Sequence, residues 1–346
     1  MALASSGQLT LGEIQTEFGG SAPTALSEYY SGGSNVPAGT QSGGGVTIPT
    51  SGEIQLSDFY GSSNFSPYTI AYLAVAGAAS GGRSPSNDGS GGGGAGGMLT
   101  GNLSASFNRD SVVTVSIGGG GASQGSTAKG NSGSSTTITG GDFTNISTTG
   151  GGGGGSHSQN DSDTIDNGVS GGSGGGGGAP GNDAVSGNNS PGGSGTAGQG
   201  NSGGTTIQAN GQDTEYEDGS LETDERRHGG SGGGGKGGAG GNGTATGIAG
   251  QGGAGEASTI TGSSVTYAVG GTGSNGNAQS GASGTANRGN GGNGGTAGNS
   301  GAGGSGVVIL SMLSARYSGT TTGSPTVTTT GDQTVLTFTG SGSYTT

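Results

Sequence analysis

Long runs of glycine fill the middle of this sequence and limit the folds that it can adopt. Glycine accounts for 95 of the 346 residues, and runs such as Gly151 to Gly155 carry no side chain at all. An ordinary globular domain contains about 7% glycine. Hydrophobic residues make up only 25% of the chain, so a conventional apolar core cannot extend through its whole length.

Three kinds of structure tolerate this much glycine: collagen, a flexible low-complexity chain, and ordered polyglycine helices. Collagen requires a strict Gly-X-Y repeat and a proline content of about 15–20%. The chain has only 8 prolines, and its glycine runs break such a repeat, which excludes collagen. A flexible chain remains an alternative, because glycine and serine disfavour ordering.

The charge of the chain argues against two classes of partner. The formal net charge is −13, and only 8 residues are Lys or Arg, so the sequence lacks the basic surface that binds nucleic acid or an anionic membrane. There is no cysteine for disulfides or thiolate metal sites. The first residues lack the pattern of a signal peptide, and the longest apolar stretch, near residues 68–79, is too short for a membrane span. We therefore expect no membrane insertion and a protein made in a cytoplasm.

Residues 1–64 differ from the rest, because they hold many of the aromatic residues and few long glycine runs. Two segments echo each other: SGQLTLGEIQ from Ser6 and SGEIQLSDFYG from Ser51. Thr10 and Glu13 have the spacing of a capping box and predict a short helix through Phe18, and residues 25–30 predict a second helical turn. We interpret this segment as a small attachment module, with an independently folded head as the alternative.

Four segments have the composition of β-strands. The runs at 68–77 and 111–121 lead directly into glycine, and the run at 306–317 follows glycine. Residues 326–340 alternate around Gly331 and Asp332 and predict a hairpin. Because strands flank the glycine-rich middle on both sides, we expect the ends to pair and clamp it. The predicted domains are residues 1–64, a glycine-rich body at 65–317, and a C-terminal hairpin tail at 318–346.

Glycine recurs at every third position in two parts of the body: Gly229, Gly232, Gly235, Gly238 and Gly241, and then Gly289, Gly292, Gly295, Gly298, Gly301 and Gly304. A polyproline-II-type helix has three residues per turn and no internal hydrogen bonds. If such helices pack together, their backbone groups must bond laterally, and the packed edges must be glycine because a Cβ would not fit. The repeat therefore predicts packed helices with structural glycines at these positions.

Several blocks, in order, resemble the glycine-rich domain of bacteriophage tail-fibre and adhesin proteins: YLAVAGAASGG (72–82), VTVSIGGGGAS (114–123), GTAGQGNSGGT (195–205), ITGSSVTYAVGGTG (260–273), GTANRGNGGNGG (284–295) and GAGGSGVVIL (301–310). Residues 1–64 resemble segments of tail-associated proteins of T4-like phages of marine bacteria. The resemblance implies a mostly irregular, all-β protein whose body is a polyglycine-II sandwich, displaying loops that contact a host receptor. Ala78, Ala79, Ser80 and Thr272 depart from the unbroken glycine expected there and predict a locally thinner lattice.

Motifs that carry chemistry are weak in this sequence. Gly230–Gly235 and Lys236 imitate a phosphate-binding loop, but Gly237 stands where Ser or Thr would bind Mg²⁺. Ser156, His157 and Asp161 supply the residue types of a catalytic triad, yet nothing in the sequence provides an oxyanion hole. The segment 213–228 faintly resembles a calcium loop but lacks its register and its final glutamate. We therefore predict no catalytic residues, no metal site and no cofactor.

Two segments, 157–167 and 213–228, hold ten of the 21 acidic residues. The second segment also concentrates aromatic and basic residues, which are favoured at binding hot spots, and loops on a rigid scaffold often serve recognition. The candidates for receptor contact are Asp161, Asp163, Tyr216, Arg226, Arg227 and His228. The alternative is that these segments are solvated loops that keep the surface soluble.

These observations favour a non-enzymatic virion protein, a tail-fibre or adhesin subunit. We expect residues 1–64 to bind other virion proteins and the body to meet a host cell-surface receptor, with the oligomeric state open. Two alternatives remain from the sequence. One is a purely architectural virion protein, such as a fibre spacer, collar or capsid decoration, and the other is an extracellular glycine-rich fibrous protein.

Overall fold

A computed structural model describes the chain except for residues 1–2, 38–39, 44, 63–67, 86–87, 104–106, 108–110, 158–163, 181–188, 208–227 and 245. The described residues form two compact units. The first comprises residues 1–69, 104–112 and 345–346, and the second, which we call the body, comprises residues 70–103 and 113–344. Strands and irregular structure predominate, and the described residues contain a single α-helix. None of the helices in these ranges has the length and hydrophobicity needed to cross a bilayer.

The first unit is built on three short helical turns: α1 (Leu11–Phe18), η1 (Leu26–Tyr29) and η2 (Leu56–Phe59). The predicted capping box is present, because the Glu13 amide donates to Thr10 Oγ1 at 3.2 Å and the Thr10 amide donates to Glu13 Oε2 at 2.7 Å. The helical turn predicted at residues 25–30 is also confirmed. Thus α1 begins where a side chain satisfies an otherwise unpaired amide.

The three turns share one local pattern. Each begins with leucine and has an acid at the third position, whose carboxylate accepts a hydrogen bond from the backbone amide of the residue before the helix. The fourth residue is a fully buried apolar or aromatic side chain. The three sets are Leu11, Glu13 and Ile14; Leu26, Glu28 and Tyr29; and Leu56, Asp58 and Phe59. Phe59 packs edge-on against both Phe18 and Tyr29. The closest echo therefore joins residues 25–30 to 55–60, rather than only Ser6 to Ser51 as the sequence suggested.

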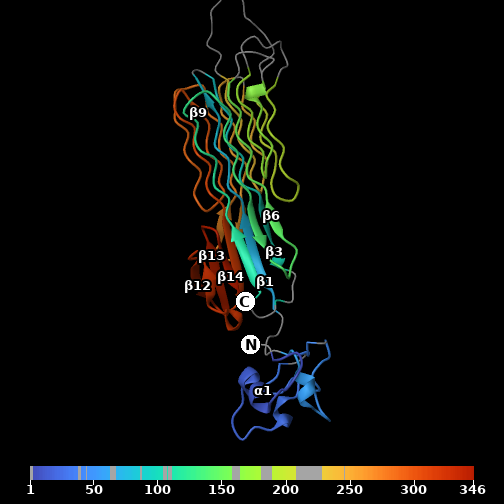
Figure 1. The fold of residues 1–346 in the computed structure, drawn as a ribbon. Helices are drawn as coiled ribbons and strands as arrows, with labels where there is room; N and C mark the ends of the chain where they lie inside the picture. Colours follow the sequence, from blue (N-terminus) through green and yellow to red (C-terminus); the bar gives the residue numbers. More distant parts are fainter. Residues whose placement is uncertain are drawn as a thin grey trace, which may run out of the picture. The chain divides into compact units, whose positions relative to one another are not determined.

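Two five-stranded sheets lie at one end of the body (Figure 1). The first has the order β12 (Thr326–Thr330), β13 (Gln333–Phe338), β10 (Val307–Leu313), β1 (Ile70–Val75), β3 (Met98–Leu103). The second has the order β11 (Thr320–Thr322), β14 (Gly342–Thr345), β4 (Val112–Ser116), β5 (Thr136–Thr139), β6 (Ile146–Thr148). The remaining short elements are β2 (Arg83–Ser84) paired with β9 (Gly295–Thr296), β7 (Glu256–Ser258) paired with β8 (Val265–Tyr267), η3 (Thr164–Asp166) and η4 (Ser314–Arg316).

Strands β1 and β10 close the body as the sequence predicted. They pair antiparallel, with Leu73 opposite Ile309 and Val75 opposite Val307. The predicted hairpin is present as β12 and β13, and it continues the same sheet beside β10. A cluster of buried apolar side chains lies at this end: Leu73, Val75, Ala95, Met98, Tyr267, Ala268, Val307, Ile309 and Val335. The available apolar residues are thus concentrated where the strands meet.

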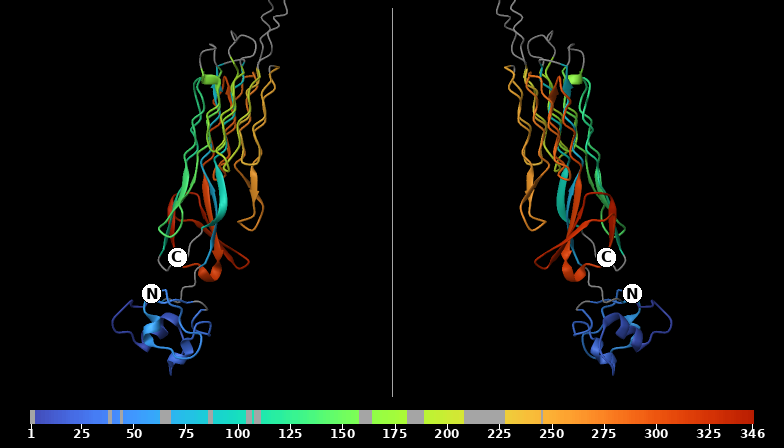
Figure 2. Two further views of the ribbon diagram at one scale, coloured as in Figure 1. Left: turned by 90° about the vertical axis from the view of Figure 1, so that its right-hand side faces the viewer. Right: turned by 90° about the vertical axis from the view of Figure 1, so that its left-hand side faces the viewer.

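Extended segments between residues 76 and 306 run side by side away from the sheets (Figures 1 and 2), and we call them the lattice. The run at residues 88–97 shows how they are joined. Its successive amides donate to three different runs, and the same three runs recur at every third residue: Gly91 and Gly94 donate to Gly155 and Gly152, Gly92 and Ala95 to Ser231 and Gly234, and Gly93 and Gly96 to Gly292 and Gly289. The carbonyls of Gly91, Gly92 and Gly93 accept from Gly82, Gly176 and Gly271, which belong to three further runs.

This pattern explains the glycine repeat. A Cβ built on Gly292 would lie 2.1 Å from the Gly301 carbonyl oxygen, and one on Gly301 would lie 1.9 Å from the Ala282 oxygen. Real Cβ atoms do not approach that closely, so glycine is required. Most of the predicted structural glycines are similarly enclosed. Gly238 differs, because its nearest neighbour would be 3.7 Å away, so the expectation of a packed edge is wrong at this position.

Non-glycine residues do not interrupt the lattice. Ala78, Ala79 and Ser80 are fully buried, and their amides donate to Gly304, Gly94 and Asn131 at 2.9–3.0 Å. Thr272 donates instead to the side chain Oδ1 of Asn293 at 3.0 Å. The expected local thinning is therefore wrong at Ala78, Ala79 and Ser80, whose amides bond to neighbouring backbone carbonyls. At Thr272 a side chain takes the place of the backbone carbonyl.

Candidate functional site

The lattice has a second end, opposite the sheets, which we call the loop end and define by β2, β9 and the residues Gly89, Ala179 and His228. Strands β2 and β9 lie there, and Ala179, Gly89 and His228 are joined by hydrogen bonds: the Ala179 amide donates to the Gly89 carbonyl at 2.9 Å, and the Gly89 amide donates to the His228 carbonyl at 2.7 Å. By chain connectivity, residues 158–163, 181–188 and 208–227 all join residues at this end.

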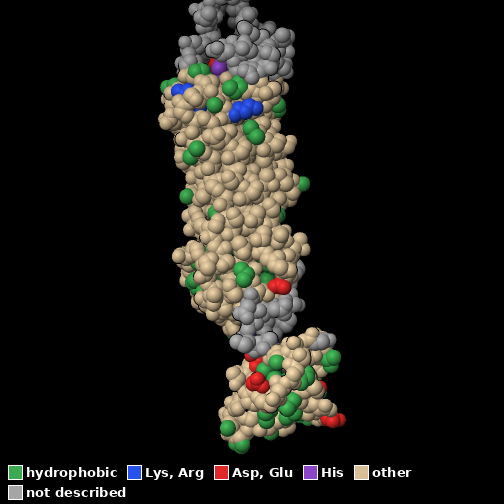
Figure 3. Space-filling model, in the orientation of Figure 1, with side chains coloured by type: hydrophobic (Ala, Val, Ile, Leu, Met, Phe, Trp, Pro, Cys, Tyr) green, Lys and Arg blue, Asp and Glu red, His purple; other side chains and the backbone are tan. Residues whose placement is uncertain are grey.

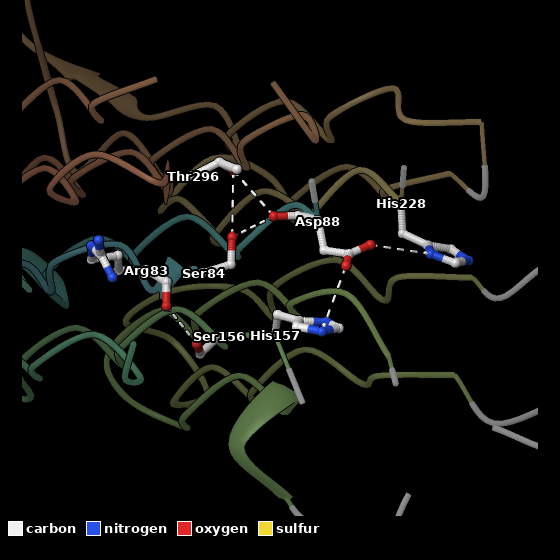
Figure 4. Close-up of polar contacts among 7 residues, drawn as sticks. All are labelled: Arg83, Ser84, Asp88, Ser156, His157, His228 and Thr296. Carbon is white, nitrogen blue, oxygen red and sulfur yellow. Dashed lines mark hydrogen bonds and ion pairs between the residues drawn. The ribbon is translucent and has the colours of Figure 1, made fainter. Parts of the chain in front are cut away.

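Three titratable side chains converge at the loop end, and we call them the Asp88 cluster (Figure 4). Asp88 Oδ2 lies 3.5 Å from His157 Nε2, and Asp88 Oδ1 lies 3.6 Å from His228 Nδ1. The side chains of Asp88, His157 and His228 are only 8%, 4% and 5% exposed. Asp88 Oδ1 and the Nδ1 atoms of both histidines have no hydrogen-bond partner in the described part of the chain. One carboxylate therefore faces two imidazoles inside a lattice that is otherwise almost uncharged.

Buried hydroxyl groups hold the backbone of Asp88. Its carbonyl oxygen accepts hydrogen bonds from Ser84 Oγ and from Thr296 Oγ1, the latter at 3.2 Å (Figure 4). Thr296 Oγ1 also lies 2.9 Å from Ser274 Oγ, which is itself within 3.1 Å of Ser90 Oγ. These residues are fully buried. Because each hydroxyl both donates and accepts, the network fixes residue 88 against β2 and β9.

The structure places only one of the predicted receptor-contact residues. Asp161, Asp163, Tyr216, Arg226 and Arg227 lie outside the described residues. His228 lies inside them, but its position differs from the expected exposed loop, because only 4% of the residue is exposed and it packs against Asp88. His157, expected in a solvated segment, is likewise buried. The reason is that both residues belong to buried runs of the lattice, at residues 150–157 and 228–235.

The weak chemical motifs have ordinary structural partners. Lys236 Nζ donates to the Gly198 carbonyl at 2.8 Å and lies 3.9 Å from Glu256 Oε2. Ser156 Oγ donates to the Arg83 carbonyl at 2.5 Å, so this hydroxyl is engaged with the backbone rather than with His157. Among the described residues, no group of three or more His, Cys, Asp or Glu side chains has an arrangement that could hold a metal ion.

The sequence did carry a signal for the Asp88 cluster, although composition obscured it. Each member stands within two residues of a glycine or glycine run, in the segments SNDGSGGGG, GGGGGSH and RHGGSGGGG. A titratable residue at the end of a lattice run must lie beside the ends of the neighbouring runs. The pairing itself needed the three-dimensional arrangement, because Asp88, His157 and His228 are far apart in sequence.

Most of the visible described surface of the body is backbone and uncharged polar side chains, and the few Lys and Arg side chains on that face lie near the loop end (Figure 3). Comparison with protein families, curated proteins and solved structures gives no match for the chain.

Proposed function

We propose that the chain is a bacteriophage tail-fibre or adhesin subunit whose lattice is a rigid scaffold for receptor contact at the loop end. The observation that carries the proposal is the hydrogen-bond pattern of the 88–97 run, which ties one extended segment to six neighbours. A scaffold of this kind holds the points at which residues 158–163 and 208–227 begin and end. Loops positioned by a rigid scaffold are a common place for recognition.

The lattice supports a polyglycine-II type of packing within this proposal. Donation to the same neighbour at every third residue, as from Gly91 and Gly94 to one run, is what a helix with three residues per turn requires. Ordering glycine costs about 1–2 kcal/mol per residue, whereas a net hydrogen bond returns about 0.5–1.5 kcal/mol. An inner residue that both donates and accepts laterally can offset that cost, but an isolated run cannot.

The first unit fits the role of an attachment module in a virion. Its core is separate from that of the body and consists of Leu3, Leu9, Ile14, Phe18, Tyr29, Val36, Ile48 and Phe59. Such a unit can bind other virion proteins while the body presents the loop end. This assignment rests on the resemblance of residues 1–64 to tail-associated proteins and makes the virion the proposed location.

Within the receptor-contact proposal, Tyr216, Arg226 and Arg227 are the recognition residues. Tyrosine and arginine combine a large contact area with hydrogen bonding and are enriched at interface hot spots. The test replaces all three with alanine and measures binding of the purified, fluorescently labelled protein to a panel of bacterial strains. Binding to the strain that binds the wild-type protein should weaken tenfold or more. The loss of a single hot-spot contact that contributes about 1.4 kcal/mol to the binding free energy already raises the Kd tenfold.

Two controls make this test decisive. An Arg316→Ala variant removes an arginine at the sheet end, in η4, and should bind as the wild type does. The melting temperature of the triple variant should equal that of the wild type, because the three substitutions leave every glycine of the lattice unchanged. Unchanged binding by a normally folded triple variant, or absence of wild-type binding to every strain, would favour the purely architectural virion protein.

A further inference from the structure

The first unit contains one local arrangement three times. When positions are counted from the leucine that begins each helical turn, taken as position 0, the three repeats span residues 3–16, 18–31 and 48–61. The capping acid at position +2 and the buried residue at position +3 are the shared features described above. Each repeat also has serine at position −5, and these residues are Ser6, Ser21 and Ser51. The shared pattern therefore extends well beyond the helical turns themselves.

Two positions of the repeat supply most of the hydrophobic core of the first unit. Position −8 is buried in every repeat, as Leu3, Phe18 and Ile48, and position +3 is fully buried in every repeat, as Ile14, Tyr29 and Phe59. All six side chains belong to one buried cluster. Repeats stacked in a line would separate the first from the third. Equivalent side chains from all three meet in one cluster because the repeats surround it.

Equivalent side-chain hydrogen bonds join the second repeat to the third and the third repeat to the first. In both cases the tyrosine hydroxyl at position +4 donates to the backbone carbonyl at position −4 of the next repeat. The two bonds run from Tyr30 to Gly52 and from Tyr60 to Gly7. The same atoms at the same positions thus make both contacts, which indicates that one rotation relates the second repeat to the third and the third to the first.

Backbone hydrogen bonds repeat the same relation. The amide at position +5 donates to the carbonyl at position −7 of the next repeat, from Ser31 to Pro49 at 2.9 Å and from Gly61 to Ala4 at 3.0 Å. These bonds do not depend on side-chain identity, since serine and glycine donate and proline and alanine accept. The equivalence is therefore a property of the backbone arrangement as well as of the sequence.

The contact between the first and second repeats is related but not identical. Gln15 stands at position +4, and its Nε2 donates to the Gly20 carbonyl at 3.4 Å, two residues before position −4 of the second repeat. The difference arises because α1 continues to Phe18, where the second repeat begins. This contact completes a ring of three repeats, so the first unit has approximate threefold symmetry.

An approximate threefold axis places equivalent residues on the same face of the unit. The leucine at position 0 is partly exposed in each repeat: Leu56 is 38% exposed, and Leu11 and Leu26 are partly buried against the core. The next residue is exposed in all three repeats, as Gly12, Ser27 and Ser57. Hydrophobic side chains also occupy more of the visible described surface on the first unit than on the body (Figure 3). The unit therefore presents three equivalent leucine sites around one axis.

We propose that the first unit binds a homotrimeric virion protein on its threefold axis, so that one copy of this chain meets three identical partner subunits. The proposal rests on the proposed function, in which residues 1–64 attach the chain to a virion. A closed homotrimer presents the same surface three times around its axis. Each of the three leucine sites can meet one partner subunit in the same way, which a partner without threefold symmetry cannot provide.

The first experiment measures the stoichiometry of this complex. An affinity-tagged full-length chain is recovered from purified virions after mild dissociation, and its complex is weighed by native mass spectrometry. We expect one copy of this chain with three copies of a single partner protein. Any other ratio, including equal numbers of the two proteins, would overturn the proposal.

The second experiment tests whether the three sites are equivalent. Gly12→Glu, Ser27→Glu and Ser57→Glu, made singly in the full-length chain, place a charge beside each leucine and so oppose an apolar contact. Position +1 is exposed in every repeat, and a Cβ on Gly12 would lie 4.0 Å from its nearest neighbour, Thr10 Oγ1, so the fold accommodates these changes. Each variant should lower incorporation into virions by about fivefold or more, and the three effects should agree within about twofold.

A matched control lies in the same unit but outside the repeats. Val46 is 67% exposed, and Val46→Glu should join virions as the wild type does. All four variants should keep the melting temperature of the first unit, which shows that lost incorporation does not come from unfolding. A loss in one or two of the three position +1 variants would indicate a partner that meets one side of the unit. That result, or normal incorporation of all three, would refute the proposal.

Deletion of residues 1–64 separates this inference from the proposed function. If the truncated chain still joins virions, the attachment role fails and the threefold partner fails with it. If the truncated chain is excluded while the three position +1 variants join normally or differ sharply from one another, the attachment role stands and the threefold partner alone is refuted. Receptor contact is measured separately by the binding of the Tyr216, Arg226 and Arg227 triple variant to bacteria.

Discussion

At Gly292 the lattice leaves no space for even one methyl group. A Cβ there would lie 2.1 Å from the Gly301 carbonyl oxygen and 2.6 Å from the Ala302 carbonyl oxygen. Both contacts are with backbone, which cannot move aside as a flexible side chain can. Gly292→Ala should therefore destabilise the body. Overpacking of a core typically costs about 1–3 kcal/mol, and we expect at least this loss here because hydrogen-bonded runs must move apart.

Thermal unfolding checks this prediction, with Gly119→Ala as the matched control. Gly119 lies in the lattice, but a Cβ there would meet no atom within 4 Å, and its φ is not in the left-handed region. We expect the melting temperature to fall by several degrees or more for Gly292→Ala and to stay within about a degree for Gly119→Ala, as for surface changes of small effect. Similar values for the two variants would contradict the packed-edge interpretation.

The sequence predicted the packed glycines better than the polar residues beside them. The three-residue repeat identified Gly292 and Gly301 as enclosed positions. Asn293 lies next to Gly292 and outside the glycine positions of the repeat, and its Oδ1 accepts a hydrogen bond from the Thr272 amide at 3.0 Å. Asn290 does the same for the Val269 amide at 3.1 Å. Each of these side chains supplies the acceptor that a backbone carbonyl supplies elsewhere in the lattice, a role that composition cannot reveal because it depends on which runs are neighbours.

At the scale of a single element, α1 depends on its capping box. The hydrogen bonds from the Thr10 hydroxyl and then from the Thr10 amide lower the pKa of Glu13 below its ordinary value of 4.5. A carboxyl whose pKa is lower in the folded state stabilises that state above its unfolded pKa, and the contribution is lost as the pH falls through the folded pKa. The start of α1 should therefore loosen as the pH falls below about 4.5.

Hydrogen exchange of the peptide that covers α1, compared with a Glu13→Gln variant at each pH, measures this effect. The ratio of the two exchange rates cancels the intrinsic dependence of exchange on pH. Wild type should be better protected than Glu13→Gln at pH 6, and the difference should disappear toward pH 3, where Glu13 is protonated. A constant ratio across this range would show that the Glu13 charge does not stabilise the helix.

The sequence also predicted the first sheet more fully than the second. The apolar runs that became β1, β4 and β10 and the hairpin of β12 and β13 carry strong strand signals. The pairing of β1 with β10 followed from their places at the two ends of the glycine-rich region, whereas its antiparallel direction comes from the structure. Strands β5 and β6 are short and rich in threonine and serine. They could not be predicted, because pairing with neighbours rather than local composition makes them strands.

At the scale of the whole molecule, the two units have hydrophobic cores that share no residue. The core of the first unit draws on residues 3–59, and the core cluster of the body draws on residues 73–335. The body is held by the pairing of β1 with β10 and by lateral hydrogen bonds between runs. Neither feature uses a residue from 1–64, so the body has what it needs to fold without them.

Deletion of residues 1–64 should therefore leave a folded body that binds bacteria but does not join a virion. Calorimetry of the truncated chain should retain the body transition at its wild-type melting temperature, because the cluster around Leu73 and Ile309 is intact. Binding to the strain that retains the full-length protein should be unchanged, since the proposed recognition residues Tyr216, Arg226 and Arg227 remain. Incorporation into particles, measured by co-sedimentation with virions, should be lost. Normal incorporation would place the docking surface in the body, and loss of the body transition would show that the units depend on each other for folding.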